Sequence, residues 1–130
     1  MATRIWYPRK SQVIKANKLM VKMFPASKRE KHEVLGSYKI DEALKETKQF
    51  PGSNLDKSAV LLRKLSNNHP FASANRRTAY YVTNQFLWKN EGYGMAKSKK
   101  KGTGKELMRK IRRGDLTHEE IKKEIGYYHG

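Results

Sequence analysis

The sequence predicts an all-α fold in a single domain. Apolar residues recur every three or four positions in several segments, which is the spacing of amphipathic helices. Pro and Gly separate these segments, and no series of alternating segments is present that would build a sizeable sheet. A chain of 130 residues can bury one modest core, whereas two separate cores would be hard to stabilise.

The first expected helix runs from Val13 to Phe24, where apolar side chains keep helical spacing, and Pro25 ends it. Residues 27–31 are polar and charged, which is typical of a loop. The stretch from His32 to Tyr38, around Gly36, indicates a short extended or hairpin segment.

Two further helices precede the segment of chemical interest. A short one is expected over residues 40–47, before the breaker at Pro51. Ser53 and Asp56 predict the cap of a longer helix that ends before Pro70. The apolar stripe of that longer helix is formed by Leu55, Ala59, Leu62 and Leu65.

A fourth helix is expected from Asn75 to about Glu91, with Gly92 as its C-terminal stop. Its buried side is predicted to contain Ala79, Val82 and Phe86, together with Tyr81 or Trp88.

The C-terminal part is predicted to be a basic extension of the same domain, with residues 1–95 as the core and residues 96–130 as the extension. Residues 97–104 have the composition of a linker. A short basic helix is expected around Ile111, and Thr117 with Glu120 predicts a capping box for a last helix.

Charge is the strongest compositional signal, because 29 Lys and Arg residues against 12 Asp and Glu give a net charge of +17. Such a field attracts polyanions, although a charge run is also typical of a solvated face. The sequence contains no Cys, which excludes disulfides and thiolate metal sites. No apolar stretch resembles a signal peptide or a membrane span, so we expect a cytoplasmic protein with no membrane partner.

The segment from His69 to Thr78 carries the chemistry. It places an imidazole, an amide and two guanidinium groups on a tight turn that leads directly into a helix. A helix N-terminus offers unpaired N–H groups and the positive end of the dipole, so phosphate oxygens are favoured there. Arg76 and Arg77 add forked donors, and Asn75 either caps the helix or donates to an oxygen.

Taken singly, these side chains have ordinary roles. His69 alone would be a loop histidine bonded to backbone, and the arginines would be surface charges. Together they predict an anion cradle, in which small residues, among them Ala72, Ser73 and Ala74, let the backbone approach the ligand. His69, at its mouth, can take a proton from a hydroxyl that attacks a phosphate.

This pattern resembles the signature of the Fic/Doc family, H-x-F-x-[DE]-[GA]-N-[GK]-R. His69, Phe71, Asn75 and Arg77 stand at its four most demanding positions, and Ala74 to Ala79 resembles the Doc branch. The likeness extends over about residues 5–93 and includes 40–52, where the family carries a target-docking flap.

The resemblance implies a Fic/Doc-like helical bundle with a small β-hairpin flap. It implies that His69 is the general base and that Phe71 anchors the loop. The phosphates of ATP or another nucleotide would be held by Ser73, Ala74, Asn75, Arg76 and Arg77 together with the loop amides. Family members transfer AMP, or in Doc a phosphoryl group, to a hydroxyl of a target protein. By this resemblance, the expected target is a translation factor. Since no internal inhibitory helix pattern is present, any restraint would come from an antitoxin partner.

Ser73 and Arg76 depart from this signature, and Tyr80, beyond it, differs from the adenylylating members. Ser73 replaces the acidic residue that holds Mg²⁺, and a hydroxyl is a weak ligand for that ion. The chain is therefore a slow enzyme, an enzyme with another metal ligand, or a nucleotide-binding relic. Tyr80 stands where adenylylating members carry a further Arg, which favours the Doc-like mode.

The main alternative is a binding protein without catalysis, which contacts nucleic acid or the ribosome through its basic surface. Its best support is the stretch from Lys97 to Arg113, where Glu106 is the single acidic residue. A metal centre is not expected, because the four histidines show no paired ligand spacing; they are His32, His69, His118 and His129.

Overall fold

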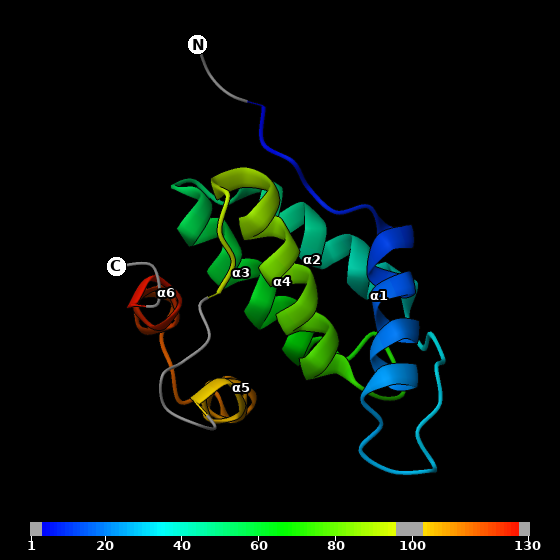
Figure 1. Ribbon diagram of the computed structural model, residues 1–130. Helices are drawn as coiled ribbons and strands as arrows, with labels where there is room; N and C mark the ends of the chain where they lie inside the picture. The colour runs from blue at the N-terminus through cyan, green and yellow to red at the C-terminus, as the bar shows by residue number, and fades with distance from the viewer. Residues whose placement is uncertain (1–3, 96–102, 128–130) are drawn as a thin grey trace.

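The structure is a computed structural model that describes residues 4–95 and 103–127. These residues form six α-helices and no sheet (Figure 1). The helices are α1 (Lys10–Met23), α2 (Ser37–Gln49), α3 (Asn54–Asn67), α4 (Asn75–Glu91), α5 (Thr103–Arg113) and α6 (His118–Tyr127).

Helices α3 and α4 form the centre of the bundle and pack against each other. On α3 pack α2, α5 and α6, whereas α1 packs on α4 and on α2 (Figure 1). The core between them is built from the apolar stripes that the sequence predicts, with fully buried side chains such as Ile40, Leu62, Val82, Phe86 and Ile121. The all-α prediction is confirmed. None of the described helices is long and apolar enough to cross a membrane.

Three predicted helix ends are observed. The Ser53 hydroxyl accepts a hydrogen bond from the Asp56 N–H at 3.2 Å, while the Asp56 carboxylate accepts from the Ser53 N–H at 3.0 Å. Thr117 and Glu120 make the same reciprocal pair at the start of α6. Gly92 ends α4 in the left-handed region, with φ of 79°, which glycine adopts without steric cost.

The expected β-hairpin is not found in the described residues. The extended segment before α2 instead makes one bridge to the α3–α4 turn, between Val34 and Phe71. The Leu35 N–H donates to the Pro70 carbonyl at 2.9 Å, and the Ala72 N–H donates to the Glu33 carbonyl at 3.0 Å. The segment has no second strand of its own because the turn provides its hydrogen-bond partners.

The helix expected over residues 40–47 is confirmed as α2, which occupies most of the stretch compared with a flap and packs against α3. Of the two alternatives for the buried side of α4, Tyr81 packs against the core, whereas Trp88 is 58% exposed. The end of the expected linker, at Thr103, already belongs to α5; residues 97–102 lie outside the described part of the chain.

A buried lysine caps the C-terminal end of α2. The Lys57 ammonium donates hydrogen bonds to the carbonyl oxygens of Thr47, Lys48 and Phe50 at 3.2, 3.0 and 2.9 Å. These carbonyls are at the negative end of the helix dipole, so a cation is stabilised there. The Lys57 nitrogen also lies 5.7 Å from the centre of the Tyr7 ring.

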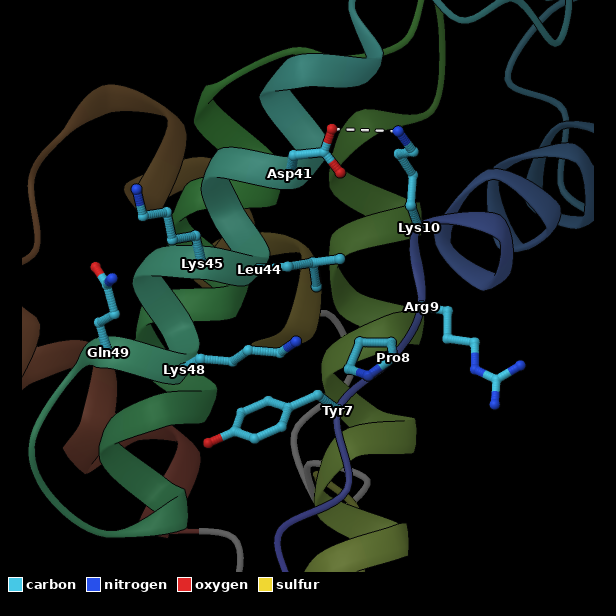
Figure 2. A pocket seen from close by; sticks show the side chains of 9 residues that line it. All are labelled: Tyr7, Pro8, Arg9, Lys10, Asp41, Leu44, Lys45, Lys48 and Gln49. Carbon is cyan, nitrogen blue, oxygen red and sulfur yellow. Dashed lines mark hydrogen bonds and ion pairs between the residues drawn. The ribbon is translucent and has the colours of Figure 1, made fainter.

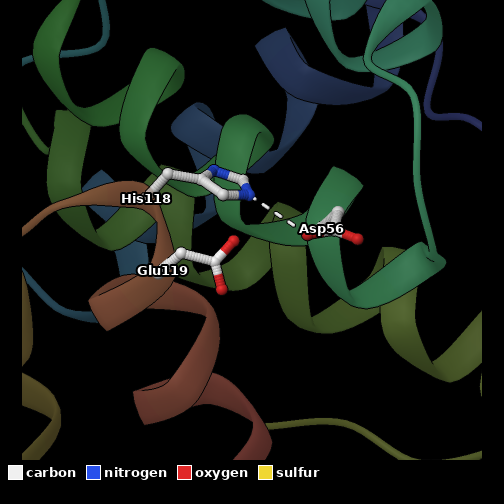
Figure 3. A group of neighbouring side chains, drawn as sticks. All are labelled: Asp56, His118 and Glu119. Carbon is white, nitrogen blue, oxygen red and sulfur yellow. Dashed lines mark hydrogen bonds and ion pairs between the residues drawn. The ribbon is translucent and has the colours of Figure 1, made fainter.

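Asp56 joins the starts of α3 and α6. Its carboxylate contacts His118 at 3.2 Å (Figure 3). It also contacts Lys122 at 3.1 Å, and the His118 ring lies 4.7 Å from that of Phe50. Partial burial alone would raise the pKa of Asp56. The hydrogen bonds from Ser53, Lys122 and His118 outweigh burial and hold this pKa well below its usual range.

Replacing Asp56 with Asn should lower the free energy of unfolding by roughly 1–2 kcal/mol at neutral pH, because a helix cap and an ion pair are lost together. A carboxylate with a lowered folded-state pKa stabilises the protein above its unfolded-state pKa of about 4, and this contribution is lost as the pH falls below that value. Urea titrations of both proteins at several pH values measure the difference. A difference that persists undiminished below about pH 3 would contradict this assignment.

Candidate functional site

The backbone of the α3–α4 turn is strained at both ends. His69 and Ala74 are the two non-glycine residues with positive φ in the described chain, at 50° and 62°. An L-residue in the left-handed region costs roughly 1–2 kcal/mol, so the surrounding contacts must hold the turn in place. Ser73 lies between these two positions, and Ala74 directly precedes α4.

Asn75 holds the turn together from inside. Its side-chain oxygen accepts from the Phe71 N–H at 3.0 Å, and its amide nitrogen donates to the Phe71 carbonyl at 2.8 Å. The same nitrogen lies 3.5 Å from Nδ1 of His69. Phe71 is 2% exposed and fixes the turn to the core. Asn75 therefore positions the backbone rather than capping α4.

The N-terminus of α4 has no side-chain cap. Ala74 occupies the cap position and has no hydroxyl or carboxylate to offer. In the described structure no partner is recorded for the N–H groups of Asn75, Arg76 and Arg77, the first three residues of the helix. These donors and the helix dipole are available to an anion.

A buried asparagine on α1 fixes the turn from the other side. Asn17 is completely buried, and its amide nitrogen donates to the Ser73 carbonyl at 2.8 Å and to the Thr78 hydroxyl at 3.0 Å. Its oxygen lies 2.7 Å from Nδ1 of His32. Since that oxygen can only accept, His32 donates from Nδ1. One side chain thus joins α1, the extended segment, the turn and α4.

The guanidinium of Arg77 is engaged by the loop that follows α1. It forms an ion pair with the Glu30 carboxylate and donates to the Phe24 carbonyl. Both side chains are partly buried, with 30% of Arg77 and 14% of Glu30 exposed. A carboxylate of the protein itself therefore occupies donors that the sequence analysis assigned to phosphate.

A family model described as Fic/DOC family matches residues 7–87, which include α1 to α3, the complete turn and most of α4. The chain belongs to the Fic/DOC family. Members of the Fic/DOC family transfer groups derived from nucleotides. The matched region ends before α5 and α6. No curated protein matches the sequence.

The Fic/DOC turn brings the predicted site residues onto one short segment. His69 is exposed at its start, Arg76 is exposed on the first turn of α4, and Arg77 lies beside it under the α1–α2 loop. Ser73 and Ala74 are half-buried. Asn75 is present as expected, but its amide is used within the turn. The sequence analysis missed Asn17 and Glu30, because neither lies in a motif.

The Fic/DOC turn does not fit a magnesium ion. Mg²⁺ prefers carboxylate oxygen ligands, and Ser73 supplies only a neutral hydroxyl. The Asn75 oxygen already accepts from Phe71, and the Glu30 carboxylate is paired with Arg77. A separate group, formed by Asp56, His118 and Glu119, has ligand atoms within 4.8 Å of one another (Figure 3). There Lys122 already neutralises Asp56, which makes the group an ion-pair cluster.

An open hollow of about 460 Å³ lies between the N-terminal segment and α2 (Figure 2), and no residue of the Fic/DOC turn lines it. Pro8 and Leu44 point into it, and the Lys48 side chain extends toward the Tyr7 ring, with the nitrogen 5.5 Å from the ring centre. The Lys10–Asp41 ion pair, at 3.2 Å, crosses its other end. None of the predicted phosphate-binding or catalytic residues lines this hollow. The turn therefore remains the candidate site.

Proposed function

We propose that the chain transfers the γ-phosphoryl group of a nucleoside triphosphate to a hydroxyl of a target protein. The observation that supports this most strongly is the uncapped N-terminus of α4, with the exposed His69 imidazole on the same turn. The helix end would bind phosphate oxygens, and the imidazole would act beside them. Family membership supports the same class of chemistry.

In this reaction the acceptor oxygen attacks the γ-phosphorus. A new oxygen–phosphorus bond forms while the bond from the γ-phosphorus to the bridging oxygen breaks, and the nucleoside diphosphate leaves. His69 takes the proton of the acceptor hydroxyl. The N–H groups of Asn75, Arg76 and Arg77 would stabilise the negative charge on the phosphate oxygens, and no step requires a protein-held metal.

The choice of a phosphoryl over a nucleotidyl group rests on Tyr80. This tyrosine is half-buried on α4, three residues after Arg77, where an adenylylating relative would place another cation. With a tyrosine there, the site has one guanidinium fewer to hold the phosphates in the orientation that exposes the α-phosphorus.

A second candidate is a nucleotide-binding protein of the same fold without turnover. The Glu30–Arg77 ion pair favours it, because a phosphate must displace this carboxylate before it reaches the guanidinium. The serine at position 73 also favours the protein without turnover, because the turn then has no acidic ligand for a metal ion.

The test of the proposal is transfer of radioactive label to proteins of a cell extract, with ATP labelled at either the α- or the γ-phosphate. Label on protein from γ alone is expected. Label from the α-phosphate would show that the reaction is adenylylation and not phosphorylation. Absence of label from both positions would favour the nucleotide-binding protein without turnover.

Replacing Glu30 with Gln should strengthen ATP binding about three- to tenfold, because the amide no longer neutralises Arg77. The change keeps an oxygen that can accept the Ala26 N–H, a bond of 2.8 Å in the structure. Isothermal titration gives the affinity. Glu33→Gln is the matched control, because Glu33 pairs on the surface with Lys31 at 3.4 Å. Equal affinities in all three proteins would mean that Glu30 does not screen the site.

A further inference from the structure

We propose that α5 is a docking surface for double-stranded nucleic acid, next to the Fic/DOC turn. The proposal stands on α5 itself and does not depend on phosphoryl transfer. Helix α5 has two unlike sides, one buried against α3 and one made of basic residues that face solvent.

The buried side fixes the orientation of the helix. Leu107, Met108 and Ile111 are nearly completely buried, and they belong to the same core cluster as the central helices. Because these three residues face α3, the opposite side of α5 must point to solvent. Arg109 and Arg113 lie there together with Glu106, Lys110 and Arg112 lie on the flanks, and all five are exposed.

The exposed cations of α5 are largely without acidic partners. Within the described residues, the ion pair recorded for this helix joins Lys110 to Glu106, at a long distance of 3.8 Å. No carboxylate is recorded within ion-pair distance of the three arginines in that part of the chain. Their charge is therefore available to a polyanion, and a net charge of +17 attracts one from a distance.

The composition of α5 selects a duplex over a single strand. Binding of single strands depends on aromatic side chains that stack on bases, and α5 contains none. Arginines along a helix suit the phosphate rows that border a groove. Eleven residues span roughly 16 Å, which corresponds to about five base pairs.

A hydrogen bond places the end of α5 beside the site. The Asn67 amide donates to the Ile111 carbonyl at 3.3 Å, and Asn67 is two residues before His69. Figure 1 shows α5 and the α3–α4 turn in the same half of the molecule. A duplex on α5 would therefore lie close to the turn.

The test is fluorescence anisotropy of the full chain with a short RNA duplex and a DNA duplex of the same sequence, over a range of salt concentrations. We expect both duplexes to bind, since phosphates are the ligand. Changing Arg109 and Arg112 together to Glu should weaken binding at least about tenfold and reduce the salt dependence by about two counterions. The milder Arg109→Gln with Arg112→Gln should give an intermediate loss, with the helical circular dichroism spectrum unchanged.

The matched control is Lys15→Glu with Lys18→Glu, which makes the same change of charge on exposed positions of α1. An equal loss in this control would overturn the proposal, because net charge alone would then explain binding. The proposal would also be overturned if the chain bound polyglutamate and bound neither duplex. His69→Ala should bind the duplexes like the unchanged protein, so a failure of the proposed catalysis is distinguishable from a failure of docking.

Discussion

Replacing His69 with Ala is expected to reduce transfer of the γ-phosphoryl group by roughly 10²–10⁴-fold, the usual contribution of a general base. His69 is exposed at the start of the turn, and its side chain supports no part of the core. The recorded polar contact of its ring is the long 3.5 Å approach to Asn75. ATP affinity and the unfolding transition should therefore change little. Initial rates of label transfer, compared with the ATP dissociation constant, give both quantities.

The control for this variant is His118→Gln. That histidine belongs to the cluster with Asp56 at the start of α3, whereas the Fic/DOC turn follows the end of that helix, so transfer should be retained. If His69→Ala were as active as the unchanged protein, His69 would not be the base. If it lost ATP binding as well, the imidazole would hold the nucleotide rather than accept a proton.

Replacing Asn17 with Leu is expected to lower the free energy of unfolding by about 2–4 kcal/mol. The Leu side chain has the same number and branching of heavy atoms as Asn, so its shape is similar, and it is somewhat larger. The change leaves the Ser73 carbonyl, the Thr78 hydroxyl and the His32 N–H without their buried partner. The turn loses its contact with α1 at Ser73, so phosphate binding should weaken in the same variant. Urea denaturation followed by circular dichroism measures the stability.

Asn67→Leu is a suitable comparison, because Asn67 is exposed and makes one recorded hydrogen bond, to Ile111. It should cost less than about 1 kcal/mol. Equal stabilities for the two variants would show that Asn17 contributes no more than an exposed amide, and the account of how the turn is held would be wrong.

The sequence was sufficient to predict the helices because their signals are local. The structure shows the predicted caps at Ser53 and Thr117 and the predicted stop at Gly92. Each of these features is made by residues no more than four positions apart in the sequence. The hairpin expectation failed for a related reason. Extended backbone at Val34 needs a partner, and a local pattern cannot show that this partner is Phe71, 37 positions further along the chain.

The candidate site was predictable only in part. The turn from His69 to Arg77 is contiguous, so its residues were identified from their order. Asn17 and Glu30 act across the fold, and each resembles an ordinary polar residue of a helix or loop in the sequence. The role of Asn75 within the turn depends on the left-handed backbone at Ala74. A small side chain is compatible with that conformation, but it does not predict it from the sequence.

The central claim is that the first turn of α4 binds phosphate. The most direct measurement is the change in backbone amide chemical shifts of the ¹⁵N-labelled protein when ATP is added. We predict that the largest changes fall on Asn75, Arg76 and Arg77, whose N–H groups point out of the uncapped helix end. Changes confined to the hollow beside Tyr7 and Lys48, with the α4 amides unmoved, would contradict the account.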